Sequence, residues 1–252
     1  TMSLFKKKVF VLVGADSELG HELVCHLSVN GARLVLGGEK RLRLDASVSE
    51  AMRLGGEAIS APMDMTKKED YENLILQARA AFGNIDYLIL NTDPSTSFCP
   101  LFADWNGFTS IDRVLSRHLT LPVYAIQLCL PFLMKRSGCI MAFSHSSSND
   151  PHPCTNALQG FLKGLQDEFQ ASKANNVHIL SVTIGDMKAD SKSEAGLVAS
   201  SAVRALATRT ATLRMDSQWS VVARRCFRSF YPKWLCGLLC CRCRRAGAKK
   251  VQ

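Results

Sequence analysis

The sequence lacks several features that would assign it to other classes of protein. It has no run of about 18 apolar residues, the minimum for a membrane-spanning helix. It has 10 cysteines but not the two Cys-x-x-Cys pairs typical of structural zinc sites. No internal repeat or low-complexity segment precedes the last 34 residues. Hydrophobic residues make up 47% and charged residues 21%, which are ordinary values for a globular protein.

Acidic residues are missing from one part of the chain. Of 31 Lys and Arg residues, nine lie in residues 219–252, where there is no Asp or Glu. Residues 1–218 are therefore charge-balanced, and the net charge of +9 belongs to the C-terminal tail. A uniformly basic nucleic-acid-binding protein is disfavoured by this distribution, so we expect no nucleic-acid partner.

Apolar runs alternate with helix-like segments along residues 1–218. Strands are expected at 9–13, 33–36, 58–61, 85–90, 139–143 and 177–184. Helices are expected at 22–27, 43–55, 67–82, 111–134 and 157–171, with a kink or break at Pro122. This alternation predicts an α/β protein with a three-layer Rossmann-type fold and a doubly wound parallel sheet. We expect one such domain over residues 1–218 and a helical, basic extension over residues 219–252.

Three segments resemble a known family. Ile85–Asn91 is similar to the fourth strand of the short-chain dehydrogenase/reductase family and its Asn-containing end. Ala157–Phe161 is similar to the helix that follows the family's catalytic Tyr and Lys, and Ser201–Trp219 to the late helix and extension of one subgroup. The order and spacing of these segments most resemble the 11-beta-hydroxysteroid dehydrogenase type 1-like members.

The resemblance implies a site for NADP or NAD. The positions that match the family's nucleotide contacts are Gly14, Ala15, Ser17, Leu19, Gly20, Arg41, Asp64, Met65 and Asn91. Gly14 and Gly20 match the first and last glycines of the family's first turn, where backbone amides and a helix N-terminus approach a pyrophosphate. Glu18 replaces the middle glycine, and a carboxylate about 5 Å from a phosphate charge costs about 3 kcal/mol. Because Asp16 adds to this repulsion, the turn predicts weak or absent dinucleotide binding.

Selectivity between the two dinucleotides stays open. Glu39 stands where NADP-preferring relatives carry Arg, whereas Arg41 and Lys40 are close enough in sequence to reach a 2′-phosphate. A structural explanation is also open, since a strand-to-helix turn needs Gly14 and Gly20 without any ligand. Asp64 and Asn91 can likewise be structural.

The family's catalytic residues are not retained. The resemblance places Pro151 at the position of the Tyr that transfers the proton and Thr155 at the position of the Lys one helical turn later. Ser144 is a possible remnant of the catalytic Ser, with Ser146 as a second candidate. The position of the relay Asn is occupied by His118. Two loop histidines titrate near neutral pH and could donate a proton, namely His145 and His152.

The tail combines an apolar helix face with basic residues and cysteines. Its apolar residues recur from Trp219 to Tyr231 at helical spacing, and Pro232 follows. Basic residues beside interfacial aromatics favour an anionic membrane surface. Four cysteines are candidate palmitoylation sites, namely Cys236, Cys240, Cys241 and Cys243. The alternatives are that this helix packs on the domain or on a partner subunit of a homodimer, or that the cysteines bind a metal.

Together these features predict a degenerate short-chain dehydrogenase/reductase homologue. We expect a binding or scaffold protein with impaired catalysis, associated with a membrane at the endoplasmic reticulum or the cytoplasmic face, and able to hold a small apolar ligand. The alternative is an active NAD(P)(H)-dependent oxidoreductase acting on a steroid-, retinoid- or lipid-like alcohol or ketone.

Overall fold

A computed structural model describes residues 4–92, 108–145, 153–172, 176–185 and 192–215. Seven strands form one parallel sheet in the order β3-β2-β1-β4-β5-β6-β7. The strands are β1 Val9–Val13, β2 Arg33–Gly38, β3 Glu57–Pro62, β4 Tyr87–Leu90, β5 Cys139–His145, β6 His178–Ile184 and β7 Thr212–Met215. The expected doubly wound parallel sheet of an α/β Rossmann-type protein is confirmed.

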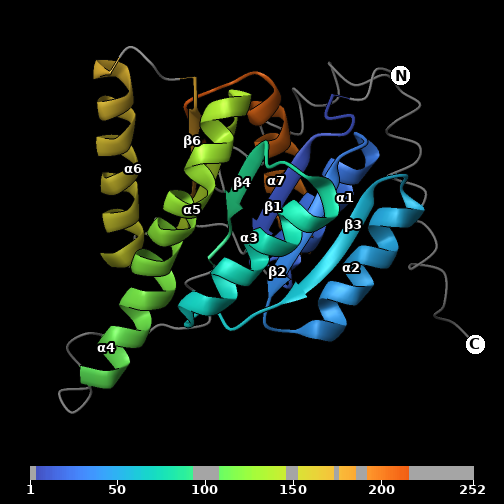
Figure 1. The fold of residues 1–252 in the computed structure, drawn as a ribbon, viewed down its shortest axis with the longest axis horizontal. Coiled ribbons are helices and arrows are strands. Elements are labelled where there is room, and N and C mark those ends of the chain that lie inside the picture. The colour runs from blue at the N-terminus through green and yellow to red at the C-terminus, as the bar shows by residue number, and fades with distance from the viewer. Residues whose placement is uncertain (1–3, 93–107, 146–152, 173–175, 186–191, 216–252) are drawn as a thin grey trace, which may run out of the picture. The chain divides into compact units, whose positions relative to one another are not determined.

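Helices cover both faces of the sheet, which gives three layers (Figure 1). One face packs against α1 (Glu18–Val29), α2 (Arg41–Arg53) and α7 (Lys192–Ala207). The other face packs against α3 (Lys68–Phe82), α5 (Leu121–Arg136) and α6 (Pro153–Ala171). All five side chains of β1 are buried, because this central strand has helices on both sides.

The long helix before β5 is divided into three parts. It consists of α4 (Phe108–Leu115), a π-helical turn η2 (Ser116–Thr120) and α5. The expected kink or break at Pro122 is confirmed as a π turn that ends two residues before this proline, which lies in the first turn of α5. Proline has no N–H group and its ring crowds the carbonyl four residues earlier, so the distortion falls on the N-terminal side of the ring. Pro131 lies inside α5, and the helix continues past it.

Two elements at the end of the sheet were not expected in full. β7 is a short edge strand in which two of the four residues are exposed. α7 begins well before the segment at 201–206 that the resemblance indicated. Residues 216–252, including the four candidate lipidation cysteines, lie outside the described residues. Among the described helices, none is long and apolar enough to cross a membrane.

The described cysteines have unpaired thiols. Cys129, Cys139 and Cys154 are buried and Cys25 is half-buried, as expected for scattered thiols in a protein core. Burial raises the pKa of Cys139 to about 12, so its thiol stays protonated at neutral pH.

Candidate nucleotide and catalytic site

The order of the strands locates the functional crevice. The chain runs outward in both directions from β1, with β2 on one side and β4 on the other. In an open α/β sheet, ligands bind outside the carboxyl ends of the strands at such a switch point. The residues that end β1, β2 and β4 are therefore the ones that a nucleotide would meet.

The turn between β1 and α1 needs its glycines for packing. Gly14 has a φ of 79°, and a Cβ atom there would lie 1.9 Å from the carbonyl oxygen of Asn91. A Cβ atom on Gly20 would lie 2.5 Å from the carbonyl oxygen of Gly14. The backbone N–H groups of Gly14 and Ala15 both donate to Gly37 O at 2.9 Å. Both glycines are thus required by the turn itself, whether or not a ligand binds.

Asn91 and Ser17 hold the same turn. The Asn91 side-chain amide donates to Gly14 O at 2.9 Å and to Ser17 Oγ at 2.8 Å. Ser17 is the N-cap of α1, and its Oγ accepts a hydrogen bond from the N–H of Gly20. Ala15 and Leu19 are buried beneath the turn. The Asn91 amide is therefore engaged in joining the ends of β1 and β4.

Glu18 points toward helix α2. Its carboxylate pairs with Arg43 at 3.4 Å, and the same Arg43 nitrogen donates to the carbonyl oxygen of Asp16 at 3.3 Å. This contact partly neutralises the charge that Glu18 brings to the helix N-terminus. The side chain nevertheless stands where the family has a glycine.

The side chain of Asp16 binds the backbone at the start of α2. Its carboxylate accepts hydrogen bonds from the backbone N–H groups of Glu39 at 3.2 Å and Lys40 at 3.0 Å. A Cβ atom on Gly38 would lie 2.5 Å from the same carboxylate, so the glycine leaves room for it. Lys40 is the N-cap residue of α2, and its own side chain makes no capping hydrogen bond. The Asp16 carboxylate instead provides the negative charge that a helix N-terminus favours. These amides are consequently already bound to an anion that belongs to the chain.

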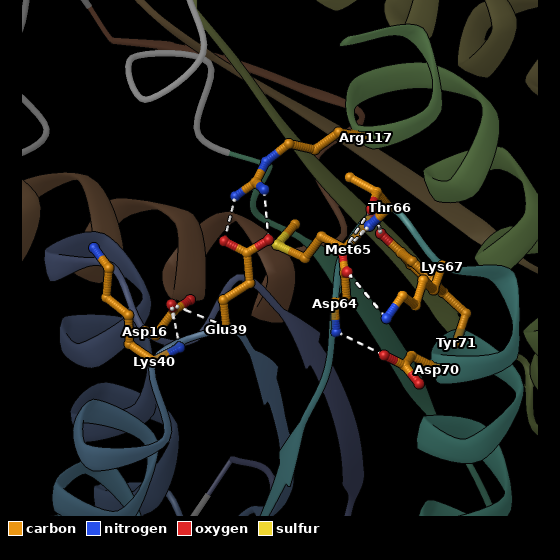
Figure 2. A network of polar contacts seen from close by, with 10 residues as sticks. All are labelled: Asp16, Glu39, Lys40, Asp64, Met65, Thr66, Lys67, Asp70, Tyr71 and Arg117. Carbon is orange, nitrogen blue, oxygen red and sulfur yellow. Dashed lines mark hydrogen bonds and ion pairs between the residues drawn. The ribbon is translucent and has the colours of Figure 1, made fainter. Parts of the chain in front are cut away.

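Glu39 is held by an arginine from the π turn. Both Nη atoms of Arg117 donate to the Glu39 carboxylate, at 2.5 and 3.1 Å (Figure 2). The Arg117 side chain is only 18% exposed. Arg41 instead lies along the surface of α2 and pairs with Asp45 at 3.8 Å, with 78% of its side chain exposed. Arg117, and not Arg41, is the arginine that reaches the end of β2.

Asp64 and Met65 follow β3 at the same edge of the sheet. The Asp64 carboxylate accepts hydrogen bonds from the N–H and hydroxyl of Thr66, which lower its pKa. Its own N–H donates to Asp70 at 2.7 Å (Figure 2). Met65 is buried. Asp64 thus makes local hydrogen bonds in the turn before α3. These contacts explain the residue without a ligand.

The side chain of Ser144 contacts polar side chains of α6 and β6. It lies in β5 and is buried. Its hydroxyl interacts with Thr183 of β6 at 3.5 Å and accepts a hydrogen bond from Gln159 of α6, which also donates to Thr183 at 2.9 Å. The hydroxyl of this possible catalytic remnant is therefore satisfied by side chains of neighbouring elements.

The described tyrosines all lie away from Ser144. Tyr71 is buried and donates to the carbonyl oxygen of Met65. Tyr87 stacks on Phe10, with ring centroids 4.2 Å apart, and Tyr124 donates to Glu72. Lys163, the first lysine of α6, pairs with Asp167 on the exposed surface. None of these contacts involves Ser144.

The remaining predicted positions lie at the end of β5, in the segment after it and in the π turn. Ser146, Pro151 and His152 lie outside the described residues, and the side chains of His145 and Thr155 are not described. His118, at the position of the relay Asn, is fully buried in the π turn. Sequence reasoning missed Arg117 and Gln159 as site residues. The only signal for Arg117 was its place beside His118.

The geometry does not fit a dinucleotide bound in the family's manner. The amides at the start of α2 hold Asp16, the acid at the end of β2 holds Arg117, and Glu18 replaces the middle glycine of the first turn. A nucleotide would have to displace contacts that the chain makes with itself.

Comparisons with known proteins show which family the chain is related to. The family model described as short chain dehydrogenase matches residues 8–197, which is most of the chain. The chain belongs to this family. One similar family member is a Hydroxysteroid 11-beta-dehydrogenase 1-like protein of Xenopus tropicalis, 28% identical over 167 residues. That alignment covers 63% of this chain and 57% of the Xenopus protein, so the chain spans little more than half of that relative's length.

Solved structures of other short-chain dehydrogenases share the fold. A Burkholderia cenocepacia short chain dehydrogenase in complex with NADP has a TM-score of 0.71 and 19% sequence identity. The match covers 84% of this chain and 97% of that protein. A metagenomic short-chain oxidoreductase in complex with NADP has a TM-score of 0.66 and 22% identity, covering 85% of this chain and 98% of that one. At these identities the likeness shows the fold.

Proposed function

We propose that this chain keeps the fold of the short-chain dehydrogenases without their hydride-transfer chemistry and acts as a binding protein. The observation that carries the proposal is the absence from the sequence of the family's Tyr and Lys after β5. The sequence has no tyrosine between Tyr124 and Tyr231 and no lysine between Lys135 and Lys163. A general acid must lie within about 3 Å of the atom that it protonates, and the segment after β5 contains no Tyr to do so.

The contacts of Ser144 and Lys163 support the same proposal. A serine that polarises a substrate carbonyl needs a hydroxyl directed into the crevice, whereas Ser144 is bound by Gln159 and Thr183. A lysine that lowers the pKa of a tyrosine needs to lie one turn from it, whereas Lys163 pairs with Asp167. The ligand class that we propose is a small apolar molecule, because the Xenopus relative is named for a hydroxysteroid.

A turnover assay tests the loss of chemistry. Full-length protein is incubated with NADH or NADPH and a panel of ketosteroids and retinals, and consumption of the reduced nucleotide is followed against a heat-inactivated sample. We expect no rate above that control.

Two histidine variants separate the outcomes of this assay. Robust turnover that survives replacement of both His145 and His152 would show that the active site lies elsewhere and would contradict the proposal. Turnover that is lost in His152→Ala alone would instead favour an active oxidoreductase with a histidine acid.

We also propose that the tail binds an anionic membrane surface. The support is compositional, since residues 219–252 hold nine basic residues, no acidic residue and several aromatic residues. Each basic residue near lipid headgroups contributes about 1 kcal/mol, and an acyl chain on Cys236, Cys240, Cys241 or Cys243 would make attachment durable.

A further inference from the structure

We infer that Arg117 and Glu39 form a latch over the nucleotide crevice, which opens before an adenosine nucleotide can bind. Glu39 follows β2 at the edge of the crevice, about 20 residues after the glycine turn. In dinucleotide-binding folds an acid at this point accepts hydrogen bonds from the ribose hydroxyls. Here both carboxylate oxygens of Glu39 accept from Arg117 instead.

The latch joins parts of the chain that a nucleotide would have to separate. Arg117 and Glu39 are 78 residues apart, and their side chains face each other (Figure 2). Arg117 belongs to η2, whose residue Leu119 packs on the side of the sheet that α5 covers. The π turn matters because its wider winding changes the direction in which residue 117 points, relative to a continuous α-helix. π-turns of this kind are frequent at functional sites.

One hydrogen-bond donor of the Arg117 guanidinium is unused. Within the described residues, the Nε atom of Arg117 is buried and has no hydrogen-bond partner. A buried donor without a partner is costly, so this arginine is poised to gain a contact when the pair rearranges. A phosphate group, like a carboxylate, has oxygens whose geometry suits a guanidinium.

The two members of the latch therefore favour different nucleotides once they are separated. Glu39 without Arg117 is an acceptor for a free ribose 2′-hydroxyl and repels a 2′-phosphate. Arg117 without Glu39 is a cation that attracts a 2′-phosphate. Asp16 adds to the exclusion of a phosphate, because it already occupies the N–H groups of Glu39 and Lys40.

This inference goes beyond the proposed function, because a closed nucleotide site and the loss of the family's Tyr and Lys are separate features of the chain. The two are tested separately, because the latch is measured as ligand affinity and the proposed function as turnover. Turnover in the wild-type protein would contradict the proposed function and leave the affinity pattern to be measured on its own.

The experiment is a calorimetric titration of full-length protein with ADP-ribose and with 2′-phospho-ADP-ribose, which differ only in the 2′-phosphate. Arg117→Gln should raise the affinity for ADP-ribose by about tenfold and change that for the 2′-phosphate form much less. Glu39→Gln should produce the opposite preference. Arg117→Lys, which keeps the charge but loses the two-point contact, should fall between wild type and Arg117→Gln.

Arg113→Gln is the matched control, because Arg113 is an exposed arginine of α4, one turn away from Arg117, and its loss changes the net charge equally. It should bind both ligands as the wild type does. Thermal unfolding of each variant shows whether the fold persists, and Arg117→Lys keeps the test valid if Arg117→Gln unfolds. Unchanged or reduced ADP-ribose affinity in folded Arg117→Gln and Arg117→Lys would overturn the latch. So would an Arg113→Gln variant that gains affinity equally.

Discussion

Glu18 is the first residue of α1, and its carboxylate contacts Arg43 of α2. An acid in the first turn of a helix stabilises that helix by roughly 0.3–1 kcal/mol. The same position is where the family brings backbone close to a pyrophosphate. One side chain therefore stabilises the helix and obstructs the ligand, and Arg43 offsets only part of its charge.

Replacing Glu18 with Gly should improve nucleotide binding while lowering stability slightly. We expect the affinity for NADH to rise at least tenfold, because a side chain and a negative charge leave the pyrophosphate position. The melting temperature should fall by a few degrees at most. Glu57→Gln is the control, because it removes the same charge from the start of β3, at the end of the strands opposite to the glycine turn. It should leave the affinity for NADH unchanged. Tight native binding that Glu18→Gly leaves unchanged would show that the turn is competent as it stands.

Local patterns predicted the residues of this site better than their roles. Gly14, Gly20 and Asn91 were predicted from the turn and from the resemblance, and the structure gives each a packing or hydrogen-bonding reason that involves no ligand. The contact of Asp16 with the start of α2 joins residues more than twenty positions apart, so no local pattern carries it. Polar side chains that bind distant backbone groups are visible only once the fold is built.

At the scale of the elements, the strands were predicted well because buried parallel strands are continuous apolar runs. β1 to β6 all lie within two residues of the expected bounds. β4 begins two residues later than expected, because Asp86 precedes it and binds the N–H of Val9 with its side chain. β7 escaped prediction because an exposed edge strand of four residues carries no apolar run. The π turn escaped it because apolar periodicity does not distinguish one wider turn from a continuous helix.

The packing of α1 against α7 should weaken in mild acid. Burial lowers the pKa of His26 in the last turn of α1, although a hydrogen bond to the backbone of Gly196 in α7 raises it. An unfolded histidine titrates near pH 6.5, so below that pH the unfolded state binds the proton more readily than the folded state. The contribution of the neutral His26 to stability is therefore present above about pH 6.5 and is lost as the pH falls.

Urea unfolding between pH 4.5 and 7.5 measures this effect. The part of the slope that one group contributes cannot exceed about 1.4 kcal/mol per pH unit, and His26→Gln should remove that part. His178→Gln, made in parallel, controls for the loss of a histidine elsewhere. If His26→Gln keeps the full pH dependence of the wild type, the titrating group is another residue.

At the scale of the whole molecule, the charge distribution divides the chain. The first 218 residues are neutral in sum, so they have no electrostatic reason to prefer a membrane. Truncation after Ser217 should therefore move the protein from the membrane fraction to the soluble fraction and leave the described fold intact, as circular dichroism would report.

Replacing the four late cysteines with Ser should weaken binding to anionic vesicles without abolishing it. The remaining electrostatic binding should decrease as salt is added, because the Debye length shortens. If the truncated chain aggregates and the full-length protein does not bind vesicles, the tail is a packing element and the membrane proposal fails.

Whether this short-chain dehydrogenase fold keeps a working nucleotide site is decided most directly by titrating full-length protein with NADH and NADPH in parallel. A repulsion of about 3 kcal/mol lowers affinity more than a hundredfold, so we expect dissociation constants above roughly 100 µM for both nucleotides. A dissociation constant near 1 µM for either nucleotide would contradict the account, because it would show that Asp16, Glu18 and the Arg117–Glu39 pair do not close the crevice.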